Sequence, residues 1–197
     1  MGAPFIYFWM KVLTEEEGAA AVALAREALA AAVRNEGFCL PPLPPVFGEK
    51  RGVFVTLTEG GELRGCIGLP YPVMPLGQAI REAAVSAGLQ DPRFPPVEPE
   101  ELPRIHVEVT VLSVPAPLGG APSEREACVQ VGTHGLIAQG YGRSGLLLPQ
   151  VATEYCWSPR EFLDHTCLKA GLPPGAWKSP GVEVLSFEGQ IFHEKEP

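Results

Sequence analysis

Residues 53–68 decide the fold and read VFVTLTEGGELRGCIG. β-Branched and aromatic side chains dominate Val53–Thr58, which is typical of a β-strand. Two glycines at the centre of Glu59–Glu62 suit a tight turn, and Leu63–Gly68 follows as a second strand. The stretch therefore predicts an antiparallel β-hairpin.

Segments with helical spacing lie on both sides of this hairpin. Thr14 and Glu17 form a capping box ahead of the alanine-rich run Ala19–Val33, which predicts a first helix. Pro75–Leu89 carries apolar residues at helical spacing and predicts a second. Ser158 precedes a proline and a glutamate that together mark the start of a third. We expect about three main helices.

Further strands complete the pattern. From Ile105 to Val111, aliphatic residues alternate with polar ones, as in a half-buried strand; the polar residues are His106, Glu108 and Thr110. Shorter strands are expected near residues 127–131, 135–139 and 145–148, and a last one at Val182–Phe192. Because hairpins join neighbouring strands, we expect an α+β fold with mainly antiparallel sheets.

Length and charge limit the organisation and the partners. A chain of 197 residues predicts one unit, 1–197, with two lobes, and a smaller lobe is expected near residues 53–115. The formal net charge of −8 argues against nucleic acid as the main partner, although a local basic groove is compatible with it. The apolar run 5–10 is too short to span a bilayer, so we expect it to dock on the body of the protein, with docking to a partner or membrane as the alternative.

The cysteines and histidines predict no metal site. Five cysteines, an odd number without a C-x-x-C pair, fit neither a disulfide framework nor a zinc ribbon and favour a cytoplasmic protein. The four histidines show no metal-ligand spacing. No phosphate-binding or dinucleotide-binding glycine motif occurs, so the sequence names no cofactor.

Cys66 is the first candidate catalytic residue. It lies in a glycine-rich strand between Gly65 and Gly68, where a ligand can approach the backbone closely. Arg64, two residues earlier, is expected on the same strand face, and a guanidinium there favours thiolate over thiol. Cys66 is then a nucleophile or a thiolate ligand. The alternative is a small buried side chain in a strand that needs its glycines for packing.

Two further places offer chemistry. Asp91 and Arg93, in a proline-rich turn after the second helix, are candidates for binding a polar ligand, or they hold the turn through their own ion pair. His134 is a candidate general acid or base, and the alternative is a histidine that belongs only to a turn.

Four strings of the sequence, in this order, resemble the AMMECR domain family, which is found in archaea, bacteria and eukaryotes; they are LRGCIG (63–68), DPRFPPV (91–97), GLLLPQV (145–151) and CLKAGLP (167–173). The likeness covers about residues 15–194. It implies a compact α+β protein with a larger and a smaller lobe, related to nucleotide- and nucleic-acid-binding modules. The resemblance assigns no settled activity.

The resemblance also bears on partners and on the site. Prokaryotic relatives are often encoded beside a Memo-like protein and a radical SAM enzyme, which implies a shared modification pathway. The central motif of the family maps onto Arg64, Gly65, Cys66 and Gly68 of this chain. The apolar run 5–10 and the acidic balance have no counterpart in the family pattern, and the acidity weakens a role in nucleic-acid binding.

Three hypotheses about function follow. The first is an enzyme or enzyme subunit with a cleft floored by Arg64–Gly68 and walled by Asp91–Arg93, where Cys66 acts as nucleophile or thiolate ligand. In this hypothesis Arg64 and backbone N–H groups around Gly65 and Gly68 bind an oxyanion or phosphate of the substrate. The second is a non-catalytic adaptor that binds nucleic acid or protein and presents a substrate to a partner enzyme. The third is that the motif only builds a tight hairpin.

Overall fold

The computed structural model describes residues 12–194, so the expected docking of the apolar run 5–10 lies outside the described residues. The chain divides into two compact units. Unit 1 runs to Val111 and resumes at Gln190, so it is discontinuous in sequence, and unit 2 is Leu112–Gly189. Each unit has its own four-stranded sheet and its own hydrophobic core.

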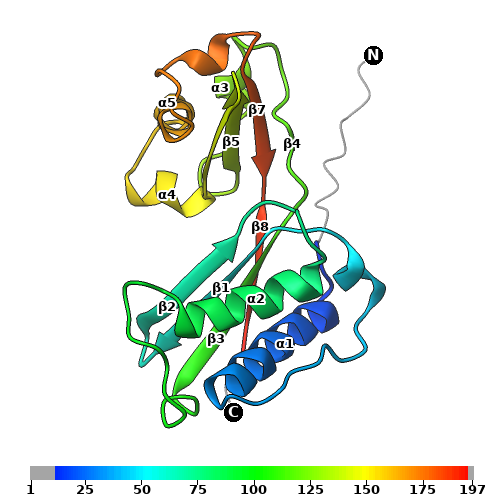
Figure 1. Cartoon of the computed structure of the whole chain (residues 1–197). Coiled ribbons are helices and arrows are strands. Elements are labelled where there is room, and N and C mark those ends of the chain that lie inside the picture. Colours follow the sequence, from blue (N-terminus) through cyan, green and yellow to red (C-terminus); the bar gives the residue numbers. More distant parts are fainter. Residues whose placement is uncertain (1–11, 195–197) are drawn as a thin grey trace. The chain divides into compact units, whose positions relative to one another are not determined.

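The sheet of unit 1 has the strand order β2-β1-β3-β8 (Figure 1). Its strands are β1 (Val53–Glu59), β2 (Glu62–Leu69), β3 (Ile105–Leu112) and β8 (Gly189–His193). β1 pairs antiparallel with both β2 and β3. The predicted hairpin and the predicted strand over 105–111 are therefore confirmed.

Two helices, α1 (Glu15–Val33) and α2 (Leu76–Leu89), cover one face of this sheet (Figure 1). α1 begins with the predicted capping box, and a short 3₁₀ helix, η1 (Pro45–Gly48), follows it. Val53, Val55 and Leu57 are fully buried in the core that β1 shares with both helices. Since successive side chains point to opposite faces of a strand, Thr56 lies on the face away from the helices.

Unit 2 contains the second sheet, with the strand order β4-β7-β5-β6. In chain order its elements are β4 (Ala116–Pro117), α3 (Arg125–Cys128), β5 (Gly135–Gly140), β6 (Arg143–Leu147), α4 (Pro149–Glu154), α5 (Pro159–Lys169), the 3₁₀ helix η2 (Ala176–Lys178) and β7 (Glu183–Phe187). α5 begins with the predicted capping box of Ser158 and Glu161. Helices and antiparallel sheets over the described residues confirm the α+β class.

Two predicted strands differ from the structure. The stretch Val182–Phe192 is divided into β7 and β8, which belong to different sheets. Between them, the N–H of Glu188 donates to the hydroxyl of Ser113, and the carbonyl of Glu188 accepts from the N–H of Ser113. The chain leaves the pairing of one sheet at this point and enters the other. Residues 127–131 form the end of α3 and a coil, because Ala127 N–H bonds the carbonyl of Glu124 and closes a turn.

The two units follow the sheets and not the order of the sequence. Residues 53–111, within the region expected to form a smaller lobe, pack in one core with α1 and Phe192 of β8 and therefore belong to unit 1. The boundary falls at Leu112. Among the residues that the structure describes, no helix has the length and apolarity needed to cross a membrane.

Candidate functional site

Cys66 lies in the middle of β2, an edge strand of the sheet in unit 1. It is paired in register with Thr56 of β1, so its side chain lies on the face away from the helices. The hydroxyl of Thr56 donates a hydrogen bond to Cys66 Sγ over 3.5 Å. The residue is half-buried.

The two glycines of the motif allow close packing. Gly65 faces the helices, and a Cβ built on it would overlap the backbone carbonyl oxygen of Ala87 in α2. A Cβ on Gly68 would overlap the ring of Phe54. Only glycine therefore lets β2 approach α2 and lets Phe54 lie over the strand.

Asp91 and Arg93 together bind the backbone of Cys66. Cys66 N–H donates to Asp91 Oδ2 (2.9 Å), and Arg93 Nη2 donates to the Cys66 carbonyl (3.0 Å). Arg93 also donates to both oxygens of Asp91, from Nε (2.9 Å) and from Nη2 (2.6 Å). The pair, called the clamp below, satisfies both backbone groups of Cys66 at the free edge of the sheet.

The electrostatics of the clamp follow from these contacts. The hydrogen bonds from Arg93 hold the pKa of Asp91 well below its usual range, although burial opposes the shift. The pKa of Arg93 is raised, first by its hydrogen bond with Asp91 and also by the neighbouring Cys66 side chain. The guanidinium that bonds Cys66 is therefore that of Arg93, and it stays charged.

Arg64 has a different role. Its guanidinium donates to both carboxylate oxygens of Glu101, from Nε (2.7 Å) and Nη2 (3.0 Å), and its Nη1 donates to the carbonyl of Pro95 (3.0 Å). The hydrogen bond from Arg64 lowers the pKa of Glu101. With a side chain only 12% exposed, Arg64 ties the loop after α2 to the edge of β2.

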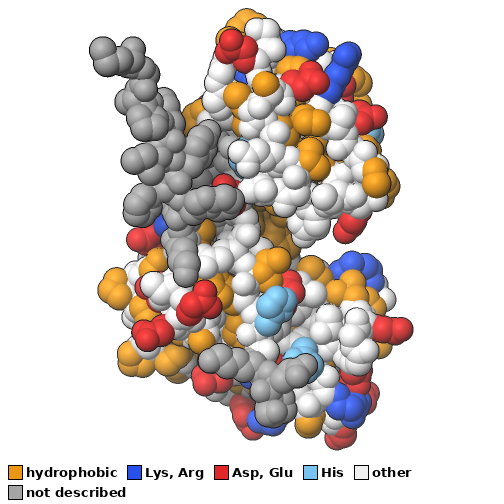
Figure 2. All heavy atoms as spheres, turned by 180° about the vertical axis from the view of Figure 1, so that it is seen from behind, with side chains coloured by type: hydrophobic (Ala, Val, Ile, Leu, Met, Phe, Trp, Pro, Cys, Tyr) orange, Lys and Arg blue, Asp and Glu red, His pale blue; other side chains and the backbone are white. Residues whose placement is uncertain are grey.

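A row of polar side chains crosses the sheet at Cys66. Thr56 is paired in register with Glu108 of β3, and His193 Nδ1 of β8 lies 3.4 Å from Glu108 Oε2. Figure 2 views the molecule from behind, and histidine side chains are visible on that face of unit 1. Sequence reasoning missed this row. The row could have been found from the alternation of polar and apolar residues in β3, together with the pairing of Cys66 and Thr56 in the hairpin.

His134 belongs to unit 2, whereas the other six candidate residues, Arg64, Gly65, Cys66, Gly68, Asp91 and Arg93, belong to unit 1. Its Nδ1 accepts a hydrogen bond from Gln130 N–H (3.2 Å) in the turn before β5. Burial lowers the pKa of His134, and the charge of Glu188 opposes this shift. The imidazole is therefore neutral at pH 7.

A pH titration of stability should detect His134. Its pKa lies below the unfolded value of 6.5, so the unfolded chain binds more protons and stability falls as the pH drops below about 6.5. Above that pH the full contribution of the neutral imidazole is present.

In urea denaturation at pH 7 and pH 5, we expect His134→Asn to lose less stability on acidification than the wild type. His106→Asn, at an exposed histidine, is the control and should keep the wild-type loss. An unchanged loss in His134→Asn would contradict this assignment.

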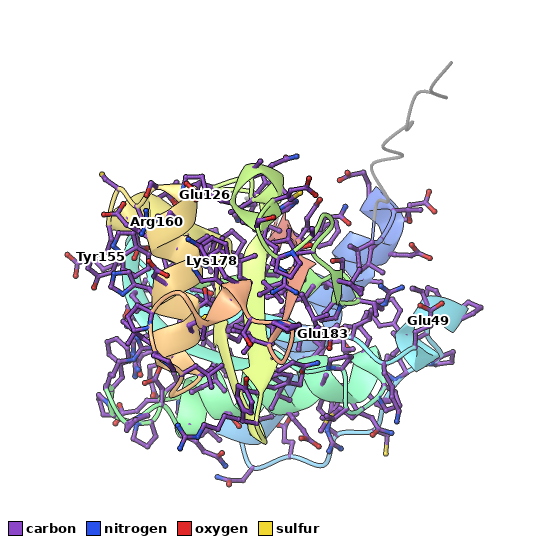
Figure 3. The ribbon with its side chains drawn as sticks, turned by 90° about the horizontal axis from the view of Figure 1, so that it is seen from above. Glu49, Glu126, Tyr155, Arg160, Lys178 and Glu183 are labelled. Carbon is purple, nitrogen blue, oxygen red and sulfur yellow. The ribbon has the colours of Figure 1, made fainter. Side chains whose placement is uncertain are left out.

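The aromatic side chains around α5 explain another histidine. His165 stacks on Trp157 with ring centroids 3.9 Å apart and planes 3° apart, and Tyr155 stacks on Trp157 at 5.1 Å. Figure 3 shows Tyr155 projecting outward. His165 is therefore a packing residue. Among the described residues, no group of three or more His, Cys, Asp or Glu side chains is arranged to hold a metal ion.

Comparison with known proteins shows the family. The AMMECR1 family profile matches residues 22–192. This chain belongs to the AMMECR1 family. An AMMECR1 relative from Methanosarcina barkeri is 55% identical over 192 residues and covers 94% of each chain, and one from Methanocaldococcus jannaschii is 48% identical over 191 residues and covers 95% of each.

A solved structure supports the same assignment. The crystal structure of an uncharacterized protein from Pyrococcus horikoshii matches with a TM-score of 0.79 and 43% identity, and the match covers 94% of this chain and 95% of that one. The AMMECR1 match includes all the candidate residues in both units. The names of these relatives state no activity.

Proposed function

We propose that this AMMECR1 protein is a thiol-dependent enzyme or enzyme subunit of a modification pathway, in which Cys66 is the nucleophile. One observation carries the proposal: the sulfur of the half-buried Cys66 accepts a hydrogen bond from Thr56, and the Arg93 guanidinium, which a buried carboxylate holds in place, donates to the Cys66 carbonyl. The thiolate is the nucleophilic form of cysteine, and the Thr56 hydroxyl and the fixed Arg93 guanidinium supply hydrogen-bond donors at the residue that carries it.

The proposed chemistry is group transfer. The Cys66 thiolate attacks an electrophilic carbon of the substrate, a bond from sulfur to carbon forms, and the leaving group departs with its electron pair. The thiol proton, released when the thiolate formed, ends on the leaving group. A second acceptor then displaces the sulfur and regenerates the thiolate. Because the thiol must stay reduced, we place the protein in the cytoplasm.

Selective alkylation tests the nucleophile. At pH 7, iodoacetamide should label Cys66 about tenfold faster than the exposed Cys39 and Cys156, as measured by peptide mass spectrometry at short times. Thr56→Val should slow labelling of Cys66, since it removes the hydroxyl donor. Thr110→Val makes the same change in β3, on the sheet face that carries Thr56, and should leave the labelling rate of Cys66 unchanged. Equal rates at Cys66 and the two exposed cysteines would contradict the proposal.

A second candidate is an adaptor that binds a partner protein. The loop after β2 exposes an apolar side chain, Val73, which is 64% exposed and follows the motif in the sequence. By the resemblance, the partner is a Memo-like protein or a radical SAM enzyme. If the adaptor reading holds, Val73→Glu weakens binding to purified partner while Cys66→Ala does not. The opposite pattern favours the enzyme.

A further inference from the structure

The guanidinium of Arg93 is only partly used by the protein. Nε and Nη2 donate to Asp91 and to the Cys66 carbonyl, and the backbone N–H of Arg93 also donates to Asp91. Within the described residues, 12–194, Nη1 donates to no backbone or side-chain oxygen, and the Cys66 side chain also interacts with the guanidinium, so Nη1 keeps donor capacity for a ligand. The side chain is 53% exposed, and solvent or a ligand reaches it.

The open donors are held in a fixed place. The Asp91 side chain is 2% exposed and anchors one edge of the guanidinium, and the Phe94 ring lies under it with its centroid 5.5 Å from Arg93 Cζ. A donor group that is already oriented loses little conformational entropy when it binds a ligand. Arg64 differs, because its Nε and Nη2 both donate to the Glu101 carboxylate and its side chain is largely buried.

The position of these donors relates them to the sulfur. Arg93 Nη2 is bonded to the carbonyl of Cys66 itself, and the Cys66 side chain acts on the guanidinium electrostatically. A group bound at Nη1 is therefore held by the same guanidinium that bonds Cys66, the residue that carries the nucleophile. Planar guanidinium groups bind carboxylate and phosphate oxygens through charge-assisted hydrogen bonds.

We propose that Arg93 binds an anionic oxygen group, a carboxylate or a phosphate, of the substrate on which Cys66 acts. The proposal rests on the proposed role of Cys66 as the nucleophile and adds the class of substrate. The charge of Asp91 offsets that of Arg93, so the ligand is held mainly by directed hydrogen bonds. The subsite selects and orients the substrate more than it increases affinity.

Two alkylating reagents that differ in charge test this subsite. Iodoacetate and iodoacetamide both react by attack of the thiolate on the CH₂ carbon, with formation of the bond from sulfur to carbon and loss of iodide, but only iodoacetate carries a carboxylate. We expect the ratio of the iodoacetate rate to the iodoacetamide rate at Cys66 to exceed that at Cys39 and Cys156 by about tenfold. The two exposed cysteines serve as controls within the same sample.

Variants and competitors locate the effect. Arg93→Met should reduce the Cys66 ratio to that of the exposed cysteines, whereas Arg104→Met, at an arginine 59% exposed in the same unit, should not change it. In the wild type, inorganic phosphate or acetate should slow iodoacetate more than iodoacetamide at Cys66. The stronger competitor shows whether the natural group is a phosphate or a carboxylate, and this arm stands even if Arg93→Met does not fold.

The outcomes separate the two proposals. If Cys66 reacts fast with iodoacetamide but shows the same ratio as Cys39 and Cys156, the anion subsite is overturned while the nucleophile stands. A Cys66 that is slow with both reagents in the folded protein overturns both. A raised ratio that survives Arg93→Met in a folded variant also overturns the subsite, because the preference then comes from another group.

Discussion

Replacing Gly65 with alanine is expected to destabilise the protein by about 3 kcal/mol. The new Cβ would overlap the carbonyl oxygen of Ala87, and a backbone atom of a packed helix cannot turn aside as a side chain can. To make room, α2 would have to leave the core that holds Ala83 and Ala84 fully buried. Urea denaturation of Gly65→Ala and of the wild type measures the loss, when the free energy of unfolding depends on urea concentration with the same slope in both.

A matched control isolates the steric effect. Gly37→Ala introduces the same methyl group where nothing lies within 4 Å, so its stability should stay within about 0.5 kcal/mol of the wild type. If Gly65→Ala were as stable as Gly37→Ala, then β2 and α2 would be free to separate, and the packing explanation of this glycine would be lost.

Removal of the clamp carboxylate should have a similarly large effect. Asp91→Ala leaves the N–H groups of Cys66 and Arg93 without their acceptor and takes the counter-ion from the guanidinium. We expect a loss of about 3 kcal/mol, and a smaller one for Asp91→Asn, which keeps an acceptor. Faster amide hydrogen exchange at Cys66 should accompany the loss, because its donor opens to water.

The pH dependence of the clamp has a defined sign. The pKa of Asp91 is lowered in the folded state, so its contribution is complete above the unfolded value of 3.8 and is lost only as the pH falls through the folded pKa. The stability difference between wild type and Asp91→Ala should therefore be the same at pH 7 and pH 5. A difference that shrinks over this range would contradict the clamp.

Local patterns predicted most of the fold. The capping boxes at Thr14 and Ser158 and the glycine turn of the hairpin are short-range signals, and each acts within a few residues. The change of sheet at Glu188 was not predictable in this way. In the sequence this place is marked by a glycine, Gly189, and the hydrogen bonds that end β7 come from Ser113, which is far away in the chain.

The candidate site was predicted in part, for the same reason. Its motif pointed to Cys66, but strand alternation assigned the neighbouring guanidinium to Arg64. The register shift between Leu57 and Thr58 breaks that alternation, and Glu101, 37 residues away, binds Arg64. The place of Arg93 beside Cys66 depends on how α2 returns the chain to the edge of β2, which no local pattern encodes.

The discontinuity of unit 1 has a consequence for biosynthesis. β8 emerges from the ribosome only after residues 112–189, and at roughly 5–20 residues per second this takes about 4–16 seconds. During that interval β3 is an open edge, and Arg26 of α1 lacks Glu194, the carboxylate it pairs with in the finished protein. The nascent chain must therefore keep a half-built sheet from joining other chains until β8 arrives.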